Sequence, residues 1–312
     1  MLLRIVHDTT YRYDPPVVTA LHLAHLSPVD QPGQTVQQHR LTITPAPAQR
    51  SDRVDAFGNP ACHFTLPGPH AELTVRADSL VHTTVPDTLP PGEPWDTVAD
   101  ALRYRAGAPY DPAAEFVFAS PYVPRHRLLA DFAHPVFEPG MPLLDAATAL
   151  MHRIHTEMTY ASGSTGVNTP TLDALTQRKG VCQDFAHIMI GCLRSLGLPA
   201  RYVSGYMLTQ PPPGKPRLIG ADASHAWVQV YDPEVGWADF DPTNDLCGLG
   251  RPAETHVTLA LGRDFGDVSP LRGVIQGGGS PRLSVAVTVA PPDELAALEE
   301  PPEASGQPDE HG

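Results

Sequence analysis

The sequence contains only four cysteines among its 312 residues, and none of them belongs to a CxxC pair. Cys62, Cys182, Cys192 and Cys247 lie far apart, without the density of a disulfide-stapled domain. Zinc ribbons and secreted disulfide scaffolds are therefore poor explanations of this chain. We expect the thiols to be reduced and the protein to be cytoplasmic.

Long hydrophobic runs are also missing. No stretch approaches the roughly 18 apolar residues of a membrane-spanning helix, and the apolar run at the N-terminus is too short for a signal peptide. Hydrophobic residues nevertheless make up 41% of the chain and charged residues 18%, which is the composition of a globular protein. At 312 residues the chain is about twice the length of a typical domain, so two domains are predicted.

Basic residues are few: 21 Lys and Arg stand against 35 Asp and Glu, for a formal net charge of -14. Half of this charge belongs to residues 293–312, which hold seven acids and no Lys or Arg. We predict a disordered acidic tail over residues 291–312. Because the remaining body is acidic too, we expect no nucleic-acid partner and no membrane partner.

The N-terminal region, residues 1–85, alternates apolar and polar residues with the two-residue period of strands. Turn sequences such as Asp14-Pro15-Pro16 separate these runs, and helical periodicity is nearly absent. The region therefore predicts an antiparallel β-sandwich-like domain. The strand candidates are residues 3–7, 40–44, 62–66 and 72–77, and a Pro-rich linker follows at 86–94.

Residues 95–290 mix both periodicities and predict an α+β second domain. Helices are expected at residues 95–105, 141–158, 172–177 and 180–197, and strands at 200–208, 224–231, 236–240 and 282–289. The helix at 180–197 has the broadest apolar stripe and ends at Gly197, so we expect it to pack in the core.

Cys182 begins this core helix, where unpaired backbone N–H groups and the helix dipole favour an anion. A working cysteine needs such help, because its thiolate rather than its thiol is the nucleophile. Gly180, two residues earlier, would allow chain and substrate to approach closely. Cys192, deep in the apolar stripe of the same helix, is typical of a core cysteine. Position therefore singles out Cys182 as a candidate nucleophile.

His225 and Asp241 are candidates for a base and its orienting carboxylate. His225 opens one predicted strand, and Asp241 ends the next. If these strands form a hairpin around Asp232-Pro233, the start of one lies beside the end of the other. Asp239 is a rival, because it shares the two-residue phase of Asp241 and strand spacing separates the two only by position.

Three sequence blocks resemble those of the transglutaminase-like superfamily, in the same order. RKGVCQDFAH at 178–187, continued by LRSLGLPARYVSGY at 193–206, resembles the cysteine block. SHAWVQVY at 224–231 resembles the histidine block, and GWADFDPTN at 236–244 the aspartate block. Residues that resemble a bacterial branch of this superfamily are 11–13, 55–59, 69–70 and 262–273.

The resemblance implies an α+β fold, with an N-terminal antiparallel β domain and a papain- or transglutaminase-like core over residues 95–290. In that core a cysteine-bearing helix packs on an antiparallel sheet. The nucleophile falls on Cys182, the base on His225 and the carboxylate on Asp241. Tyr160 and Gln183 are further candidates for lining the substrate or oxyanion site.

The implied reaction is acyl transfer from a peptide or protein amide through a thioester on Cys182. Water as acceptor makes the protein a cysteine peptidase or amidase, and an amine makes it a transglutaminase. We favour hydrolysis because the resemblance is to the bacterial branch. No Ca²⁺-loop pattern is visible, so neither a metal nor another cofactor is expected. The oligomeric state is left open.

Two other classes of function compete with this interpretation. A non-catalytic binding module on the same fold would be favoured by loss of the cysteine, histidine or aspartate, but all three are present. A zinc hydrolase could use His152 and His155, or His22 and His25. Neither pair belongs to an H-E-x-x-H motif, so this hypothesis is the weakest.

Overall fold

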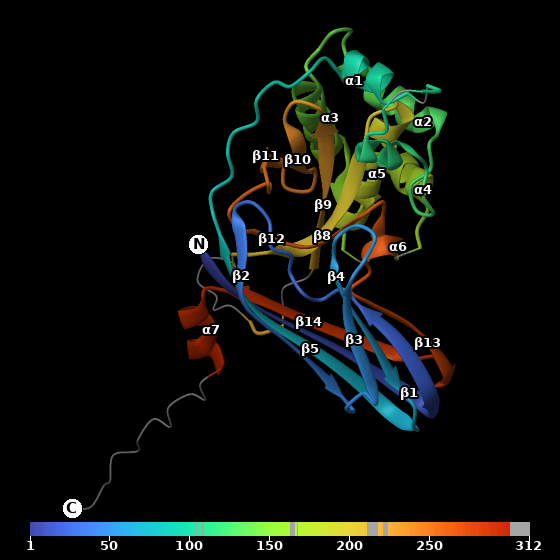
Figure 1. Ribbon diagram of the computed structural model, residues 1–312, viewed down its shortest axis with the longest axis vertical. Coiled ribbons are helices and arrows are strands. Elements are labelled where there is room, and N and C mark those ends of the chain that lie inside the picture. The colour runs from blue at the N-terminus through green and yellow to red at the C-terminus, as the bar shows by residue number, and fades with distance from the viewer. Residues whose placement is uncertain are drawn as a thin grey trace, which may run out of the picture.

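The structure of the protein is a computed structural model. The structure describes residues 1–103, 105–107, 109–162, 166, 168–210, 218–220 and 224–299. A helix-covered five-stranded sheet forms one half of the molecule, and a larger antiparallel sheet forms the other (Figure 1). No described helix combines the length and apolar character needed to cross a bilayer.

The larger sheet is organised around one long strand, β1 (Leu2–Ala24). The first half of β1 pairs with β5 and β14, and the second half pairs with β4 and β13, all antiparallel. The sheet also contains β2 and β3 at its edges. The remaining bounds are β2 (Gln34–Thr44), β3 (Gln49–Val54), β4 (Pro60–Leu66), β5 (His70–Thr83), β13 (Leu271–Gly277) and β14 (Arg282–Ala290).

The predicted turn at Asp14-Pro15-Pro16 is wrong, because β1 continues through it. The register of β1 against β5 shifts between Arg12 and Val17, so the prolines occupy an interruption of the ladder. A proline has no N–H to donate, and such an interruption is where a strand can accommodate one. The prolines therefore do mark an irregularity, but it is a register shift within one strand and not a turn between two strands.

The C-terminal part of the predicted second domain lies in the first sheet instead. β14 forms the strand expected at 282–289, yet it pairs with β1, as does β13. The tail prediction also needs correction, since residues 292–299 form helix α7 (Pro292–Glu299). Leu295 is buried in a cluster with Val6 and Ala290, which anchors this helix. Residues 300–312 lie outside the described residues.

The smaller sheet has the strand order β11-β10-β9-β8-β12 and is antiparallel throughout. Helices α3 and α5 contact it, and α2 and α4 pack around α5 (Figure 1). The helices are α1 (Trp95–Ala101), η1 (Pro112–Val117), α2 (Arg127–Ala133), η2 (His134–Val136), α3 (Leu143–Glu157), α4 (Thr171–Gln177), α5 (Cys182–Ser195) and α6 (Phe265–Val268). The strands are β6 (Thr159–Tyr160), β7 (Lys179–Gly180), β8 (Ala200–Met207), β9 (Ser224–Asp232), β10 (Gly236–Asp241), β11 (Leu246–Leu249) and β12 (His256–Gly262).

Helix α5 is the central element of this half of the molecule. Nearly all of its residues are buried, including Phe185, Ile188 and Cys192 in the stripe expected from the sequence. On the facing strand β9, Ala226 and Val228 belong to the same apolar cluster. Because burying each such side chain contributes roughly 1.5–3 kcal/mol, the position of the helix start is firmly set.

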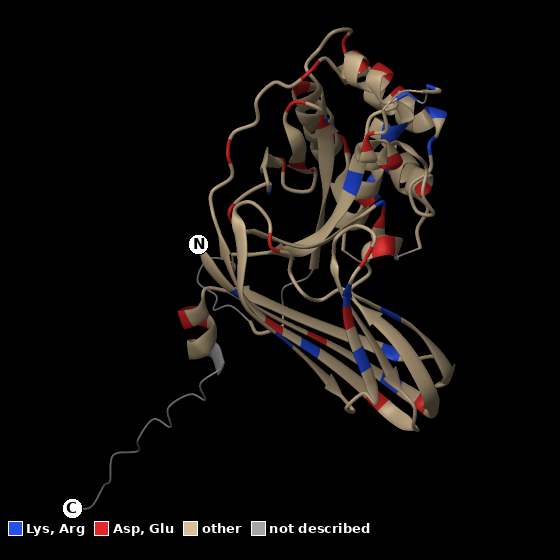
Figure 2. Cartoon of the chain, viewed as in Figure 1, with Lys and Arg blue, Asp and Glu red and all other residues tan. Residues whose placement is uncertain are grey.

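The two halves are joined by both apolar and polar contacts. Leu3, Ile5 and Val287 of the large sheet share a buried cluster with Tyr206 and Val257 of the small one. Gln34 of β2 donates to the Thr258 carbonyl of β12 and accepts from the Thr258 N–H, both at 2.8 Å. Within the large sheet, charged residues of both signs are present (Figure 2), and Arg4–Asp78, Arg12–Glu72 and Arg76–Asp8 pair across β1 and β5.

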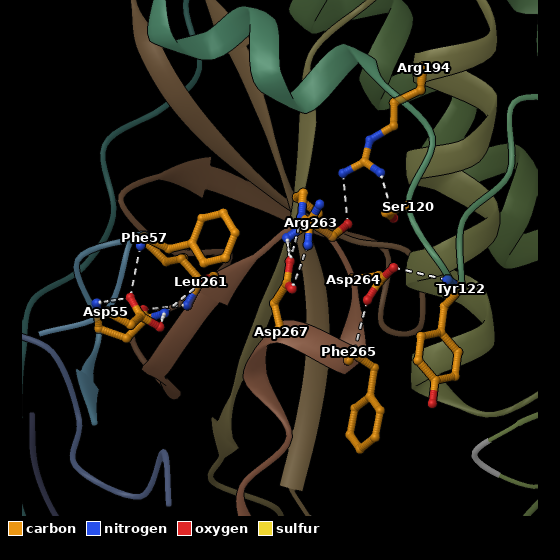
Figure 3. A network of polar contacts seen from close by, with 12 residues as sticks. Asp55, Phe57, Ser120, Tyr122, Arg194, Leu261, Arg263, Asp264, Phe265 and Asp267 are labelled. Carbon is orange, nitrogen blue, oxygen red and sulfur yellow. Dashed lines mark hydrogen bonds and ion pairs between the residues drawn. The ribbon is translucent and has the colours of Figure 1, made fainter. Parts of the chain in front are cut away.

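The turn after β12 organises a polar junction at the far end of α5 (Figure 3). The buried Arg194 guanidinium donates to Ser120 Oγ at 3.0 Å and to the Arg263 carbonyl at 2.7 Å. Asp264 accepts from the Tyr122 backbone N–H at 2.9 Å and from Gly266 N–H at 2.8 Å. These bonds fix α5 relative to the strands that carry the candidate site.

Candidate active site

Cys182 is the first residue of α5, where the sequence predicted a helix start, and its side chain is half-buried. The helix end is fixed by Asp184, whose Oδ2 accepts from the Val181 N–H at 2.8 Å. Gly180 leaves room for this arrangement, because a Cβ there would lie 2.6 Å from Asp184 Cβ. Cys182 therefore stands at the N-terminal end of the α5 dipole, which favours an anion.

His225 is the second residue of β9 and is 8% exposed. Its Nε2 lies 2.7 Å from Asp241 Oδ2, so an Nε2–H donates to the carboxylate. The Cys182 thiol is close enough to act on the same imidazole by charge and hydrogen bonding. With Nε2 engaged, Nδ1 is the ring nitrogen that is left to exchange a proton with Cys182.

The electrostatics of this pair favour a charged imidazole. Burial alone lowers the pKa of His225, but the Asp241 charge, the Asp241 hydrogen bond and Cys182 raise it to about 10. The pKa of Asp241 is held well below its usual value by His225 and His256, which outweigh the opposing effect of its own burial. At neutral pH the site therefore holds an imidazolium against a carboxylate.

Asp241 is fully buried at the end of β10, and both of its oxygens are saturated with donors. Oδ2 accepts from His225, from Asn244 Nδ2 at 2.7 Å and from His256 Nε2 at 3.1 Å. Oδ1 accepts from the backbone N–H groups of Thr243 at 2.9 Å and Asn244 at 3.3 Å. A carboxylate with this many donors is held in one orientation and ionised.

Asp239, the rival carboxylate, has different partners. It pairs across the strands with Gln229, and it accepts from Trp227 Nε1 at 2.7 Å and from Gln229 Nε2 at 3.0 Å. Burial raises its pKa to about 7, despite these bonds and nearby arginines. The structure therefore places Asp241, and not Asp239, against His225.

Sequence reasoning missed two residues of this site, His256 and Asn244. His256 is wholly buried on β12, where it also packs edge-on against Trp227 at 5.3 Å between ring centroids. Burial lowers the pKa of His256 even though Asp241 opposes this, so it donates to Asp241 as a neutral ring. No motif marks His256, because β12 reaches the site only through its pairing with β8.

The two oxyanion candidates lie at the same helix start. Tyr160 of β6 pairs in parallel with Gly180 of β7, which lies two residues before Cys182. Its ring is half-exposed and packs edge-on near Phe185 at 6.3 Å. Burial and the Cys182 charge raise the Tyr160 pKa, so its hydroxyl is a proton donor at neutral pH. Gln183 follows Cys182 in α5 and is half-buried.

The histidines of α3 serve the turn that follows Asp241. His152 Nδ1 lies 2.8 Å from Asp245 Oδ2, and His155 Nδ1 lies 3.1 Å from the Thr243 carbonyl oxygen. These contacts tie the helix to the residues whose N–H groups hold the carboxylate. Their position gives the pair a structural role next to the candidate site.

A metal ion could be held by His225, Asp241 and His256, whose ligand atoms all lie within 4.8 Å of one another. The distances of 2.7 and 3.1 Å to Asp241 Oδ2 are those of hydrogen bonds, so both imidazoles are already engaged. His22 lies in β1 of the large sheet, and His25 follows the end of that strand. His22 stacks on Phe64, and His25 contacts Asp55 at 3.2 Å.

A half-buried cysteine at a helix start, beside a histidine–aspartate pair on an antiparallel sheet, is the architecture of papain-like proteins. The sequence matches two families: Bacterial transglutaminase-like N-terminal region over residues 3–82, and Transglutaminase-like superfamily over residues 130–242. The chain therefore belongs to the transglutaminase-like superfamily.

The relatives support the same placement. An uncharacterized Mycobacterium tuberculosis protein is 40% identical over 284 residues, covering 87% of each chain. One from Mycobacterium leprae is 35% identical over 291 residues, covering 92% of this chain and 98% of the relative. A Pseudomonas aeruginosa protein-glutamine gamma-glutamyltransferase is 35% identical over 127 residues, which is 38% of this chain and 18% of that protein.

The fold is also similar to that of a solved structure. The structure of a candidate cysteine protease from Cytophaga hutchinsonii superposes with a TM-score of 0.69, covering 93% of this chain and 90% of that one. The two sequences are 22% identical, so the similarity establishes the shared fold. Both sheets of the present chain thus belong to a known arrangement.

Proposed function

We propose that the protein is a cysteine peptidase or amidase, which transfers the acyl group of a peptide or protein amide to water through a thioester on Cys182. The observation that supports this most strongly is the 2.7 Å contact between His225 and Asp241 beside the Cys182 helix start. A carboxylate that fixes and charges an imidazole next to a thiol is the arrangement that activates cysteine as a nucleophile.

The first chemical step forms a thioester. The Cys182 thiolate, stabilised by the His225 imidazolium and the helix N-terminus, attacks the amide carbonyl carbon. The C–N bond then breaks, and His225 gives its Nδ1 proton to the departing amine. Asp241 stays ionised throughout and keeps the imidazole in place through Nε2.

The second step consumes the thioester. Neutral His225 takes a proton from a water molecule, which attacks the thioester carbonyl, and the C–S bond breaks. The acid is released and Cys182 leaves as a thiolate beside the recharged imidazolium. The negative oxygen formed in each step would be bound by backbone N–H groups of the first turn of α5, with Gln183 and Tyr160 as side-chain candidates.

Transamidation is the second candidate function, and one observation favours it. The Pseudomonas relative that carries the name protein-glutamine gamma-glutamyltransferase matches 38% of this chain. The thioester is common to both reactions, so the acceptor alone distinguishes them. In either case a protein or peptide is the partner that we propose, and a cytoplasmic location stays a prediction.

A competition experiment separates the two acceptors. A library of peptide amides is incubated with the protein, with and without a primary amine in excess, and the products are weighed by mass spectrometry. We expect the free acid to dominate even when the amine is present. A dominant amine adduct would replace hydrolysis with transamidation, and absence of both products would remove the enzymatic proposal.

A further inference from the structure

A cavity of about 570 Å³ lies between the two halves of the molecule, away from Cys182. Loops at 29–33, 58–59 and 84–87 of the N-terminal half form one side, and the strands of the small sheet form the other. Gln229 in its lining is four residues along β9 from His225, or about 13 Å at the usual strand rise. The cavity is thus separate from the candidate active site.

Arg251 is the most deeply buried charged residue in this lining, with 1% of its surface exposed. Its Nη2 donates to the Pro32 carbonyl at 3.3 Å, but Nη1 has no hydrogen-bond partner among the residues that the structure describes. The loop at residues 29–33 packs closely against the guanidinium of Arg251, since a Cβ at Gly33 would lie 2.8 Å from Nη2. A buried donor without a partner is costly, so Nη1 calls for an acceptor.

Arg201 contributes a second guanidinium to the same cavity. Its Nε donates to Gln229 Oε1 at 2.7 Å, and its charged group stacks on Trp237 at 3.9 Å from the ring centroid. Within the described part of the chain its two terminal amino groups make no hydrogen bond. The stacking holds the guanidinium rigid, as a binding fork requires.

The acids near these arginines do not satisfy them. Asp239 is buried behind the lining and is already bonded to Trp227 and Gln229. Asp30 and Asp87 are exposed residues at the cavity mouth, where water screens their charge. Glu254 also acts on Arg251 by charge, but its carboxylate is paired with the N-terminal amino group. The two guanidinium groups therefore share one buried carboxylate, Asp239, which leaves hydrogen-bond donors available in the cavity.

We propose that this cavity binds a small organic acid, whose carboxylate is held by Arg251 and Arg201. The remaining walls are largely apolar and would take a hydrocarbon part of the ligand; they include Val85, Pro86, Val235, Trp237, Leu249 and Leu261. This combination favours a carboxylate on an apolar body over a fully hydrated inorganic anion.

The test uses the full chain with Cys182→Ala, so that binding does not depend on the proposed activity. Hexanoate, hexan-1-ol and inorganic phosphate are titrated separately by isothermal calorimetry. We expect saturable one-to-one binding of hexanoate that is tighter than binding of the other two. Arg201→Gln should weaken hexanoate binding about tenfold or more, because a charge-assisted contact is lost.

Arg12→Gln, at an exposed arginine of β1, is the matched control and should leave hexanoate binding unchanged. Arg251→Gln should also weaken hexanoate binding, and a circular dichroism spectrum verifies that this variant is folded. If Arg251→Gln is unfolded, the result for Arg201→Gln alone tests the proposal. Equal affinity for hexanoate and hexan-1-ol, tighter binding of phosphate, or an unaffected Arg201→Gln variant would each overturn the proposal.

Discussion

Replacing Cys182 with alanine is expected to abolish turnover of every peptide amide that the wild-type protein cleaves. The sulfur forms the covalent bond of the thioester, and no other described cysteine lies at the site where His225 and Asp241 meet. The effect should appear in kcat, at least about 10³-fold, because removing a nucleophile eliminates the covalent route entirely. Mass spectrometry of the products after extended incubation measures it.

Cys192→Ala is the matched control, since it removes the same atom from the same helix. Cys192 is fully buried in the apolar cluster, and burial raises the pKa of its thiol. The variant should lose some stability through the small cavity it creates but keep its turnover. Residual wild-type turnover in Cys182→Ala would show that the chemistry occurs elsewhere.

Asp241→Ala should lower kcat/KM about 10²–10⁴-fold with Cys182 and His225 both intact. The change removes the charge that keeps the His225 pKa high and the acceptor that fixes its Nε2. His256→Phe removes only one of the donors to Asp241 Oδ2, so its loss should be intermediate. Steady-state kinetics on the best amide from the library measure all three proteins.

Asp239→Ala tests whether Asp241 acts by orienting His225 or only by stabilising the fold. Asp239 is equally buried on the same strand, so its loss should cost comparable stability. It bonds to Trp227 and Gln229 and not to His225, so its loss should affect the thermal midpoint much more than kcat. Similar kinetic losses in Asp239→Ala and Asp241→Ala would mean that both carboxylates act only on stability.

Local sequence patterns were sufficient for the elements that carry the site. The helix at Cys182 and the strands at His225 and Asp241 all have strong periodicity and clear turn residues, and the structure has each within two residues of the expected bounds. Strand spacing alone left Asp239 and Asp241 unresolved. The outcome depends on the register of β10 against β9, which the contacts of neighbouring side chains decide.

Features that depend on distant pairing could not be predicted. β13 and β14 join β1 across at least 247 residues of sequence, from Ala24 to Leu271, so no local pattern assigns them to the first sheet. The same holds for His256, which meets Asp241 only because β12 pairs with β8. The acidic composition of residues 292–299 led to a prediction of disorder, although they form helix α7. One buried leucine, Leu295, anchors this helix to Val6 and Ala290.

Rapid alkylation of Cys182 is the most direct test of the account. Wild-type protein and a His225→Ala variant are treated with a mild thiol alkylator, and intact masses are followed over time. We predict one fast modification, located at Cys182 by peptide mapping, that becomes much slower in His225→Ala. Equal labelling of several cysteines, or the same rate in both proteins, would contradict an activated thiol at this site.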